Sequence, residues 1–164
     1  GVSKLKSATG TLTQSALVGT PSYMAPEQAE ARKVDERADL FAAGAVLYRA
    51  LTGRPPFSGE GPAQILYEVV HRQPMRPSKL LPEIPKQVEY VLAIAMAKDP
   101  RHRFASGTNL FAAFRDAAAG RLDERLVARA KRLLKAQPWG CVVHGEARDI
   151  GPASSASAMF MMDA

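Results

Sequence analysis

A segment without a single charged residue, from Leu40 to Tyr48, sets the strictest condition on how this 164-residue chain can fold. The sequence around it predicts a helix over 34–52, capped by Asp35 and ended by Gly53, with two prolines close behind. A helix that is apolar nearly all round has no face suited to water. We therefore expect it at the centre of a core. At its edge, the Asp39 carboxylate should have hydrogen-bond partners, local backbone amides or more distant groups.

Apolar stripes at helical spacing predict three further helices, at 62–72, 85–97 and 106–119. Ser106 is a suitable cap for the last of them. The intervening segment 73–85 holds four prolines and is predicted to be irregular. Residues 3–22 are rich in Ser, Thr and Gly and have the composition of a loop. No run alternates as a strand would, so the sequence predicts an all-helical domain.

The composition is that of an ordinary folded domain, with 46% hydrophobic and 23% charged residues. Cys141 is the single cysteine, which excludes an intrachain disulfide and favours a reducing compartment. No stretch reaches the roughly 18 continuous apolar residues that a membrane span needs. The first residues lack the apolar core of a signal peptide. These features predict a cytoplasmic protein without a transmembrane segment.

The formal net charge of +6 comes mostly from a fifth predicted helix, at 121–136, which is basic and amphipathic. Such a helix can lie on an anionic membrane surface, dock on an acidic partner, or simply cover a core with its charged side in water. All three interpretations are open from sequence. The tail at 138–164 is rich in Gly, Ala and Ser and is predicted to be disordered.

Three motifs occur in a meaningful order and spacing. The first is Gly-Thr-Pro-Ser-Tyr-Met-Ala-Pro-Glu at 19–27. The second is Asp-Leu-Phe-Ala-Ala-Gly at 39–44, followed by Leu-Thr-Gly-Arg-Pro-Pro-Phe at 51–57, and the third is Lys-Asp-Pro-Arg-His-Arg-Phe at 98–104. The Ala-Pro-Glu string at 25–27 would be weak evidence on its own, since short motifs recur by chance. Together they resemble the C-terminal lobe of a bacterial eukaryotic-like serine/threonine protein kinase.

The resemblance implies a mainly α, partial protein-kinase-like fold: the activation segment and C-lobe helices, without the N-lobe β-sheet or the catalytic loop. It covers residues 1–119 and leaves out the basic helix at 120–137 and the tail. Gly1 resembles the last residue of the Asp-Phe-Gly metal-binding motif, so we expect no metal ligand in this chain. Residues 3–18 would be the activation loop, with phosphorylation candidates at Thr11, Thr13 and Ser15.

The same resemblance implies roles for residues further along. The loop that receives the substrate would comprise Gly19, Thr20, Pro21, Ser22, Tyr23 and Met24. The Thr20 hydroxyl would contact the catalytic aspartate. Glu27 would form a buried ion pair with Arg103, whose planar guanidinium matches a carboxylate. Asp39 would hold the catalytic loop from below, and the helix at 62–72 would be a docking surface.

Phosphoryl transfer by kinases also needs a glycine-rich loop, a strand lysine, a catalytic aspartate, an asparagine and the metal-binding aspartate. These motifs do not occur in the 164 residues. The resemblance implies ATP and Mg²⁺ for the full-length family and no cofactor in this chain. The predicted function is therefore that of a serine/threonine protein kinase, acting on protein Ser or Thr, represented by its substrate-facing lobe and catalytically incomplete as given.

Two alternatives remain open. The chain could be a non-catalytic interaction module that binds a kinase or substrate through the helix at 62–72 and the basic helix, or a gene fragment that never accumulates as protein. Because the chain begins with Gly rather than Met, its start is interpreted as a cut, which upstream DNA encoding Asp-Phe in frame would establish. Expected partners are protein substrates or a kinase, not nucleic acid; the substrate itself is not predicted.

Overall fold

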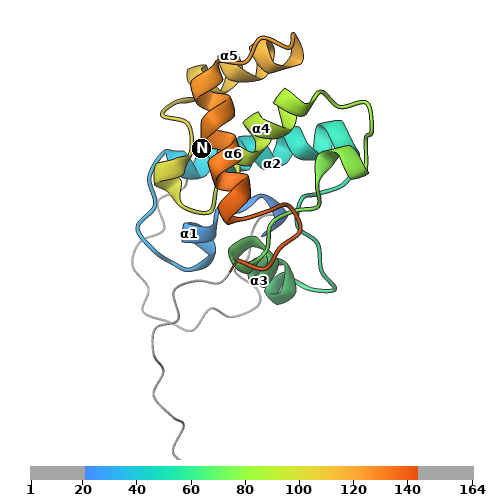
Figure 1. Ribbon diagram of the computed structural model, residues 1–164. Coiled ribbons are helices and arrows are strands. Elements are labelled where there is room, and N and C mark those ends of the chain that lie inside the picture. Colours follow the sequence, from blue (N-terminus) through green and yellow to red (C-terminus); the bar gives the residue numbers. More distant parts are fainter. Residues whose placement is uncertain (1–20, 144–164) are drawn as a thin grey trace, which may run out of the picture.

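The computed structural model describes residues 21–143, and its regular structure is helical (Figure 1). In chain order the elements are η1 (Pro21–Tyr23), α1 (Pro26–Ala29), α2 (Arg37–Thr52), α3 (Pro62–His71), η2 (Pro77–Lys79), α4 (Lys86–Ala95), η3 (Pro100–His102), α5 (Gly107–Ala118) and α6 (Glu124–Ala136), where η marks a 3-10 helix. Within 21–143, extended pairing is limited to one antiparallel bridge, between Arg72 and Val142. The predicted mainly α fold class is confirmed.

α2 occupies the core, as its uncharged sequence predicts, but one strip of it meets solvent. Phe41, Ala45 and Tyr48 are buried. Val46, on another side of the same helix, is 54% exposed. The prediction of a helix buried nearly all round is therefore correct for one face only, because no element in the described part of the chain covers the strip that carries Val46.

The ends of α2 follow the local chemistry predicted for them. The Asp35 carboxylate accepts a hydrogen bond from the backbone N–H of Arg37 at 2.9 Å, which satisfies one of the free amides of the first turn. Gly53 ends the helix in the left-handed conformation, with φ of 73°, which glycine adopts without strain. The helix begins three residues later than predicted.

α4 is the most enclosed helix and lies among α2, α5 and α6. It approaches α2 closely where Gly44 faces it. A Cβ atom on Gly44 would lie 2.8 Å from Cβ of Ala95 and 3.0 Å from Cγ of Met96, closer than real side chains pack. The absence of a side chain at Gly44 thus sets the separation of the two central helices.

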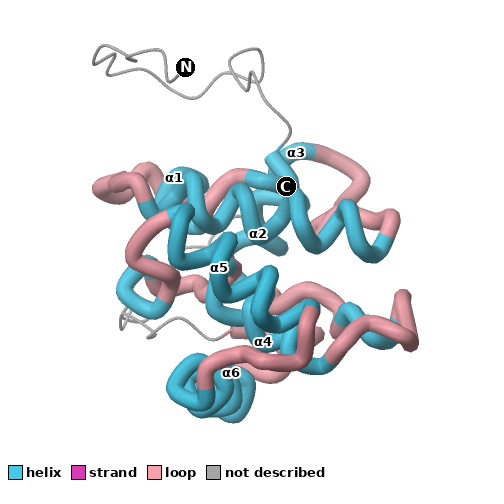
Figure 2. Tube along the Cα trace, turned by 90° about the horizontal axis from the view of Figure 1, so that it is seen from above, coloured by secondary structure: helices cyan, strands magenta, loops and turns pink. Residues whose placement is uncertain are grey.

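α6 packs on α4 and belongs to the core (Figure 2). Ala130 is buried, and the apolar residues that pack against the core beside it are Leu126, Val127, Leu133 and Leu134. The sequence placed a domain boundary at 119/120 and treated 120–137 as an addition. That boundary stays a prediction, but the packing shows that the apolar stripe of α6 completes the cover of α4.

The described part of the tail, residues 138–143, runs beside the end of α3. The backbone N–H of Val143 donates to the carbonyl of His71 at 2.5 Å, and Gln73 N–H donates to the carbonyl of Cys141 at 2.9 Å. Gly140 N–H donates to Pro74 at 2.9 Å. For these six residues the predicted disorder is corrected, since their backbone groups pair with the 71–74 segment. Residues 144–164 lie outside the described range.

The proline-rich segment 73–85 is irregular as predicted, apart from the single turn of η2. It is anchored to the core by Tyr48, whose hydroxyl donates to the backbone carbonyl of Met75 at 2.8 Å. Burial disfavours the charged phenolate and raises the pKa of Tyr48 to about 12. Tyr48 is therefore a neutral hydrogen-bond donor at every physiological pH.

Candidate functional site

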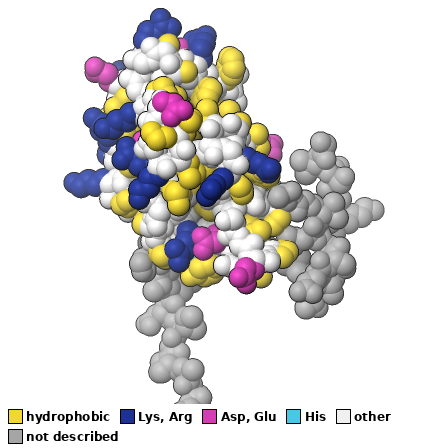
Figure 3. Space-filling model, turned by 90° about the vertical axis from the view of Figure 1, so that its right-hand side faces the viewer, with side chains coloured by type: hydrophobic (Ala, Val, Ile, Leu, Met, Phe, Trp, Pro, Cys, Tyr) yellow, Lys and Arg dark blue, Asp and Glu magenta, His cyan; other side chains and the backbone are white. Residues whose placement is uncertain are grey.

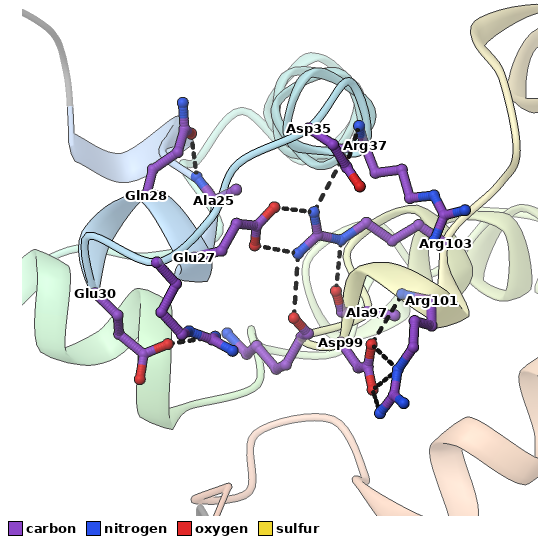
Figure 4. Close-up of polar contacts among 12 residues, drawn as sticks. Ala25, Glu27, Gln28, Glu30, Asp35, Arg37, Ala97, Asp99, Arg101 and Arg103 are labelled. Atoms are coloured by element: carbon purple, nitrogen blue, oxygen red, sulfur yellow. Dashed lines mark hydrogen bonds and ion pairs between the residues drawn. The ribbon is translucent and has the colours of Figure 1, made fainter. Parts of the chain in front are cut away.

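A buried ion pair joins the first and third sequence motifs (Figure 4). Nη1 of Arg103 donates to Oε1 of Glu27 at 2.6 Å, and Nη2 donates to Oε2 at 2.7 Å. The Arg103 side chain is 0% exposed and that of Glu27 is 2% exposed. The two residues that the resemblance paired are thus in direct two-point contact, away from solvent.

The rest of the guanidinium is also saturated with acceptors. Nε of Arg103 donates to the carbonyl of Ala97 at 2.8 Å. Nη1 makes a second bond to the carbonyl of Arg37 at 2.9 Å, and Nη2 makes one to Lys98 at 3.1 Å. All five N–H groups of the side chain therefore have a partner. Arg103 thus forms hydrogen bonds to α1, to the start of α2 and to the residues that follow α4.

The local sequence explains how the pair is positioned. Glu27 is the second residue of α1, directly after Pro26, whose fixed φ suits a helix start. Arg103 follows η3, which Asp99 caps by accepting from the backbone N–H of Arg101 at 2.8 Å. Hydrogen bonds from Arg101 lower the pKa of Asp99 to about 2. Asp99 is therefore an ionised cap at every physiological pH.

α6 reaches this site through a side chain that sequence reasoning did not single out. Nη2 of Arg129 donates to the carbonyls of both His102 and Arg103 at 2.5 Å. Burial lowers the pKa of Arg129 from its ordinary value. No local sequence signal could have identified this contact, because Arg129 lies 27 positions after His102 and 26 positions after Arg103. Arg129 fixes the backbone from which Arg103 extends.

The described part of the substrate-receiving loop is held against the helices. Pro21, Ser22 and Tyr23 form η1, with Ser22 buried, and Met24 N–H donates to the Pro21 carbonyl at 3.1 Å. The Tyr23 hydroxyl accepts a hydrogen bond from Nη1 of Arg49 in the last turn of α2. The loop is thus tied to α2 through Tyr23. Gly19 and Thr20 lie outside the described residues.

Within the described residues, Asp39 lacks the fixed partners that its position suggested. The residue is exposed, and within 21–143 no side-chain hydrogen bond or ion pair reaches its carboxylate. The expectation of fixed partners rested on burial, and this side of α2 faces solvent. The proposed anchoring of a catalytic loop by Asp39 stays a prediction. The other residues implied by the resemblance that lie outside the described range are Gly1, Thr11, Thr13 and Ser15.

Lys98 is a buried cation to which the sequence analysis gave no role. Its ammonium lies 4.2 Å from the ring centroid of Phe57 and 5.9 Å from that of Phe41. Nζ donates to the backbone carbonyl of Val69 in α3. Burial, together with the positive charge of Arg103, lowers the pKa of Lys98 to about 7. Lys98 therefore links α3 to the segment that carries Arg103.

A second largely buried acid, Glu89, was also missed. Arg76 Nε contacts both of its carboxylate oxygens at 3.1 Å, and Ser78 N–H donates to it at 2.9 Å. Burial raises the pKa of Glu89, but these hydrogen bonds outweigh burial and hold it below its ordinary value. The signal was present in the sequence, because a carboxylate inside the apolar run of α4 needs a partner.

Two further features concern ligands and membranes. Among residues 21–143 there is no group of three or more His, Cys, Asp and Glu side chains that could hold a metal ion. No helix in the same range combines the length and the apolar character needed to cross a membrane.

Comparison with known proteins places this geometry in a family. Residues 1–113 match the protein kinase domain, and the chain belongs to that family. The relatives compared below are bacterial serine/threonine protein kinases. The fold is therefore the mainly α part of a protein kinase domain, and the resemblance seen in the motifs is confirmed.

Two of these relatives show how much of each chain the similarity covers. The chain is 42% identical over 144 residues to the serine/threonine-protein kinase Pkn1 of Myxococcus xanthus, which covers 87% of this chain and 20% of that protein. It is 45% identical over 105 residues, 63% of this chain and 15% of the relative, to the probable serine/threonine-protein kinase PknB of Bifidobacterium longum. The chain thus spans a fifth or less of the length of these relatives. The Pkn1 match is longer than the 119 residues to which the sequence analysis confined the resemblance.

Proposed function

We propose that the protein transfers the γ-phosphoryl group of ATP to Ser or Thr side chains of protein substrates, and that these 164 residues supply the substrate-facing lobe for this reaction. Membership of the protein kinase family and the names of the relatives support the reaction class. ATP as co-substrate and the single cysteine favour a cytoplasmic location.

The observation that carries the proposal is the way the segment 21–27 is held. Tyr23 is bound to α2 through Arg49, and Glu27 is bound to Arg103 in the core. A segment fixed at these two points on rigid helices keeps one conformation. Pre-organisation of this kind is what a substrate-positioning element needs, because orienting the reacting groups supplies a large share of the rate enhancement.

The described residues do not fit Mg²⁺, since no acidic cluster of ligand size occurs among them. The sequence also lacks the glycine-rich loop and the His-Arg-Asp string of kinases. We therefore propose that ATP, the metal ion and the catalytic base are held by other parts of a kinase domain. On this proposal the 164 residues alone do not transfer phosphate.

A chimera tests both parts of the proposal. Residues 1–136 of this chain would replace the corresponding segment of the Myxococcus xanthus relative, whose similarity covers most of this chain. We expect the chimera to phosphorylate Ser or Thr of a general protein substrate, and the isolated 164-residue chain to show no ATP-dependent phosphorylation above a no-enzyme control. A matched chimera with Thr20→Ala should lose most of its activity, since it lacks the hydroxyl expected to contact the catalytic aspartate.

A folded chimera that binds ATP but phosphorylates nothing would contradict the proposal and favour the non-catalytic interaction module. Phosphate transfer by the isolated chain, at a rate that survives repurification, would contradict the proposed incompleteness. Circular dichroism and ATP binding measured on each chimera separate a failure to fold from a failure to catalyse.

A further inference from the structure

Two neighbouring hollows meet at Trp139. One has a volume of about 660 Å³ and lies between the end of α2, the end of α3 and the segment 73–80. The other has a volume of about 350 Å³ and lies between the start of α4 and the end of α6. Arg76 and Trp139 line both hollows, which we call together the Trp139 groove.

The groove is strongly basic. The Lys and Arg side chains that line it without an acidic partner in the described part of the chain are Arg54, Lys79, Lys86, Lys131 and Lys135. All five are exposed. Lys and Arg side chains also outweigh acidic ones over the upper part of the face drawn in Figure 3. Like charges gathered along a concave surface reinforce one another and attract an anionic partner.

The acids that line the groove are already neutralised. Glu68 pairs with Arg72 at 3.2 Å, and Glu89 pairs with Arg76 at 3.0 Å. Neither carboxylate is available to the five unpaired cations. Among the residues described, the groove therefore lacks the negative charge that would balance it, and a bound partner would have to supply that charge.

Trp139 gives the groove an apolar centre with an unused donor. Its indole Nε1 is buried and has no hydrogen-bond partner within residues 21–143. An enclosed donor without an acceptor is unfavourable. The ring is held by packing against the core. An aromatic side chain bordered by Lys and Arg side chains can bind a ligand that carries both carboxylates and apolar side chains.

We propose that the Trp139 groove is a docking site for an acidic segment of a partner protein, separate from the surface that receives the phosphorylated residue. Carboxylates of the partner contact the five unpaired cations, and an apolar side chain packs at Trp139. The groove is formed jointly by the 73–80 segment, α4 and α6, so it exists only because α6 is part of the fold.

A peptide explains the groove better than an anionic membrane does. Membrane-surface helices insert an apolar stripe below the headgroups. In α6 that stripe is turned inward, with Ala130 buried and Leu126 and Leu133 packed against the core. The cations also line hollows, which a side chain can enter and a flat surface cannot.

The test uses the 164-residue chain and a short labelled peptide of alternating Glu and Leu. Trp139 is the single tryptophan of the chain, so its fluorescence reports on this site alone. We expect saturable binding by anisotropy, with a matching change in Trp139 emission, that weakens with added salt. A peptide with Gln in place of Glu should not bind.

Charge reversals on α6 provide matched variants. Lys131→Glu with Lys135→Glu changes the groove wall, whereas Arg125→Glu with Arg132→Glu makes the same change in charge on exposed positions of the same helix outside the groove. We expect the first pair to weaken binding about tenfold or more, equivalent to about 1.4 kcal/mol, and the second to have little effect. Lys79→Glu with Lys86→Glu, on the opposite wall, should weaken binding like the first pair.

Several outcomes would overturn the proposal. Equal losses in the α6 groove and control variants would mean attraction by net charge alone. Binding that leaves Trp139 emission unchanged would place the peptide elsewhere. Absence of peptide binding, or binding only to vesicles of anionic phospholipid, would exclude an acidic protein segment as the occupant. Circular dichroism spectra matching that of the parent chain establish that each variant is folded.

Discussion

Arg103 and Glu27, 76 residues apart in sequence, meet in a buried two-point ion pair in which the arginine leaves no N–H group without an acceptor. The pair joins a segment near the start of the described chain to the residue that follows η3. The number of satisfied hydrogen bonds in the pair decides how much its loss costs in stability. A buried pair with unmet hydrogen bonds contributes little, whereas removing one partner of a saturated pair leaves both a charge and several carbonyls without contacts.

Replacement of Arg103 by Ala should therefore destabilise the fold severely. The variant leaves the Glu27 carboxylate buried and unpaired and removes the donors to Ala97, Arg37 and Lys98. We expect a loss of about 3–5 kcal/mol in the free energy of unfolding, measured by urea denaturation. Arg115→Ala is the control, since Arg115 is 66% exposed and pairs only with its chain neighbour Asp116, so its loss should change the midpoint little. Equal midpoints for the parent chain and Arg103→Ala would contradict this role.

Lys98 should make stability rise with pH. Below about pH 7 both states carry the charged ammonium, so the full cost of burying it applies. Between about 7 and 10.5, the ordinary value, the folded state has released the proton and the unfolded state has not. The unfolded state then binds more protons, and stability increases with pH.

The measurement is the free energy of unfolding at a neutral and at an alkaline pH, for the parent chain and for Lys98→Met. We expect the parent chain to gain about 1 kcal/mol or more relative to the variant, since one pKa unit corresponds to about 1.4 kcal/mol. Parallel pH profiles for the two proteins would show that Lys98 keeps an ordinary pKa in the fold.

Glu89 should also make stability rise with pH, but in the acid range. Its pKa is lowered in the folded state, so its contribution is complete above the ordinary value of 4.5 and is lost as the pH falls below it. The stability of the parent chain and of Glu89→Gln should therefore converge on acidification, as followed by unfolding midpoints. Glu83→Gln, at an exposed position near the start of α4, should give a profile parallel to that of the parent chain.

Arg49 connects the fold to the proposed substrate loop. Arg49→Ala removes the hydrogen bond to Tyr23 from an exposed residue, so the global stability should change little. In the active chimera we expect KM for the protein substrate to rise while the ATP dependence stays unchanged, because the loop loses one anchor. Steady-state kinetics with each substrate varied in turn make the distinction. An effect on ATP alone would contradict the assignment of Tyr23 to the substrate side.

The sequence predicted the features that depend on local patterns. The positions of α2, α3, α4, α5 and α6 follow from apolar periodicity, and the ends of α2 follow from Asp35 and Gly53. The ion-pair partner of Glu27 was predictable only through the family resemblance. Local chemistry requires a cation for a buried carboxylate but does not say which of the 22 Lys and Arg residues supplies it.

The features that the sequence missed depend on contacts between distant residues. Lys98 lies in a quoted motif, but its stacking on Phe57 and its bond to Val69 arise only when α3 packs beside it. The burial of the α6 stripe and the pairing of residues 138–143 with 71–74 are likewise tertiary. The error at Asp39 has the same origin, because an uncharged helix predicts burial without indicating which of its faces is covered.

Two helical glycines offer a last test of how closely α2 and α4 pack. Alanine is intrinsically better than glycine in a helix by about 1 kcal/mol. Gly107, the first residue of α5, has open space where a Cβ would be, so Gly107→Ala should leave stability unchanged or raise it. At Gly44 the same added methyl would lie 2.8 Å from Cβ of Ala95. Overpacking of a core typically costs about 1–3 kcal/mol, enough to outweigh the gain in propensity, so Gly44→Ala should lower the free energy of unfolding in urea. A Gly44→Ala variant as stable as Gly107→Ala would mean that the two central helices separate freely, and that Gly44 does not set their distance.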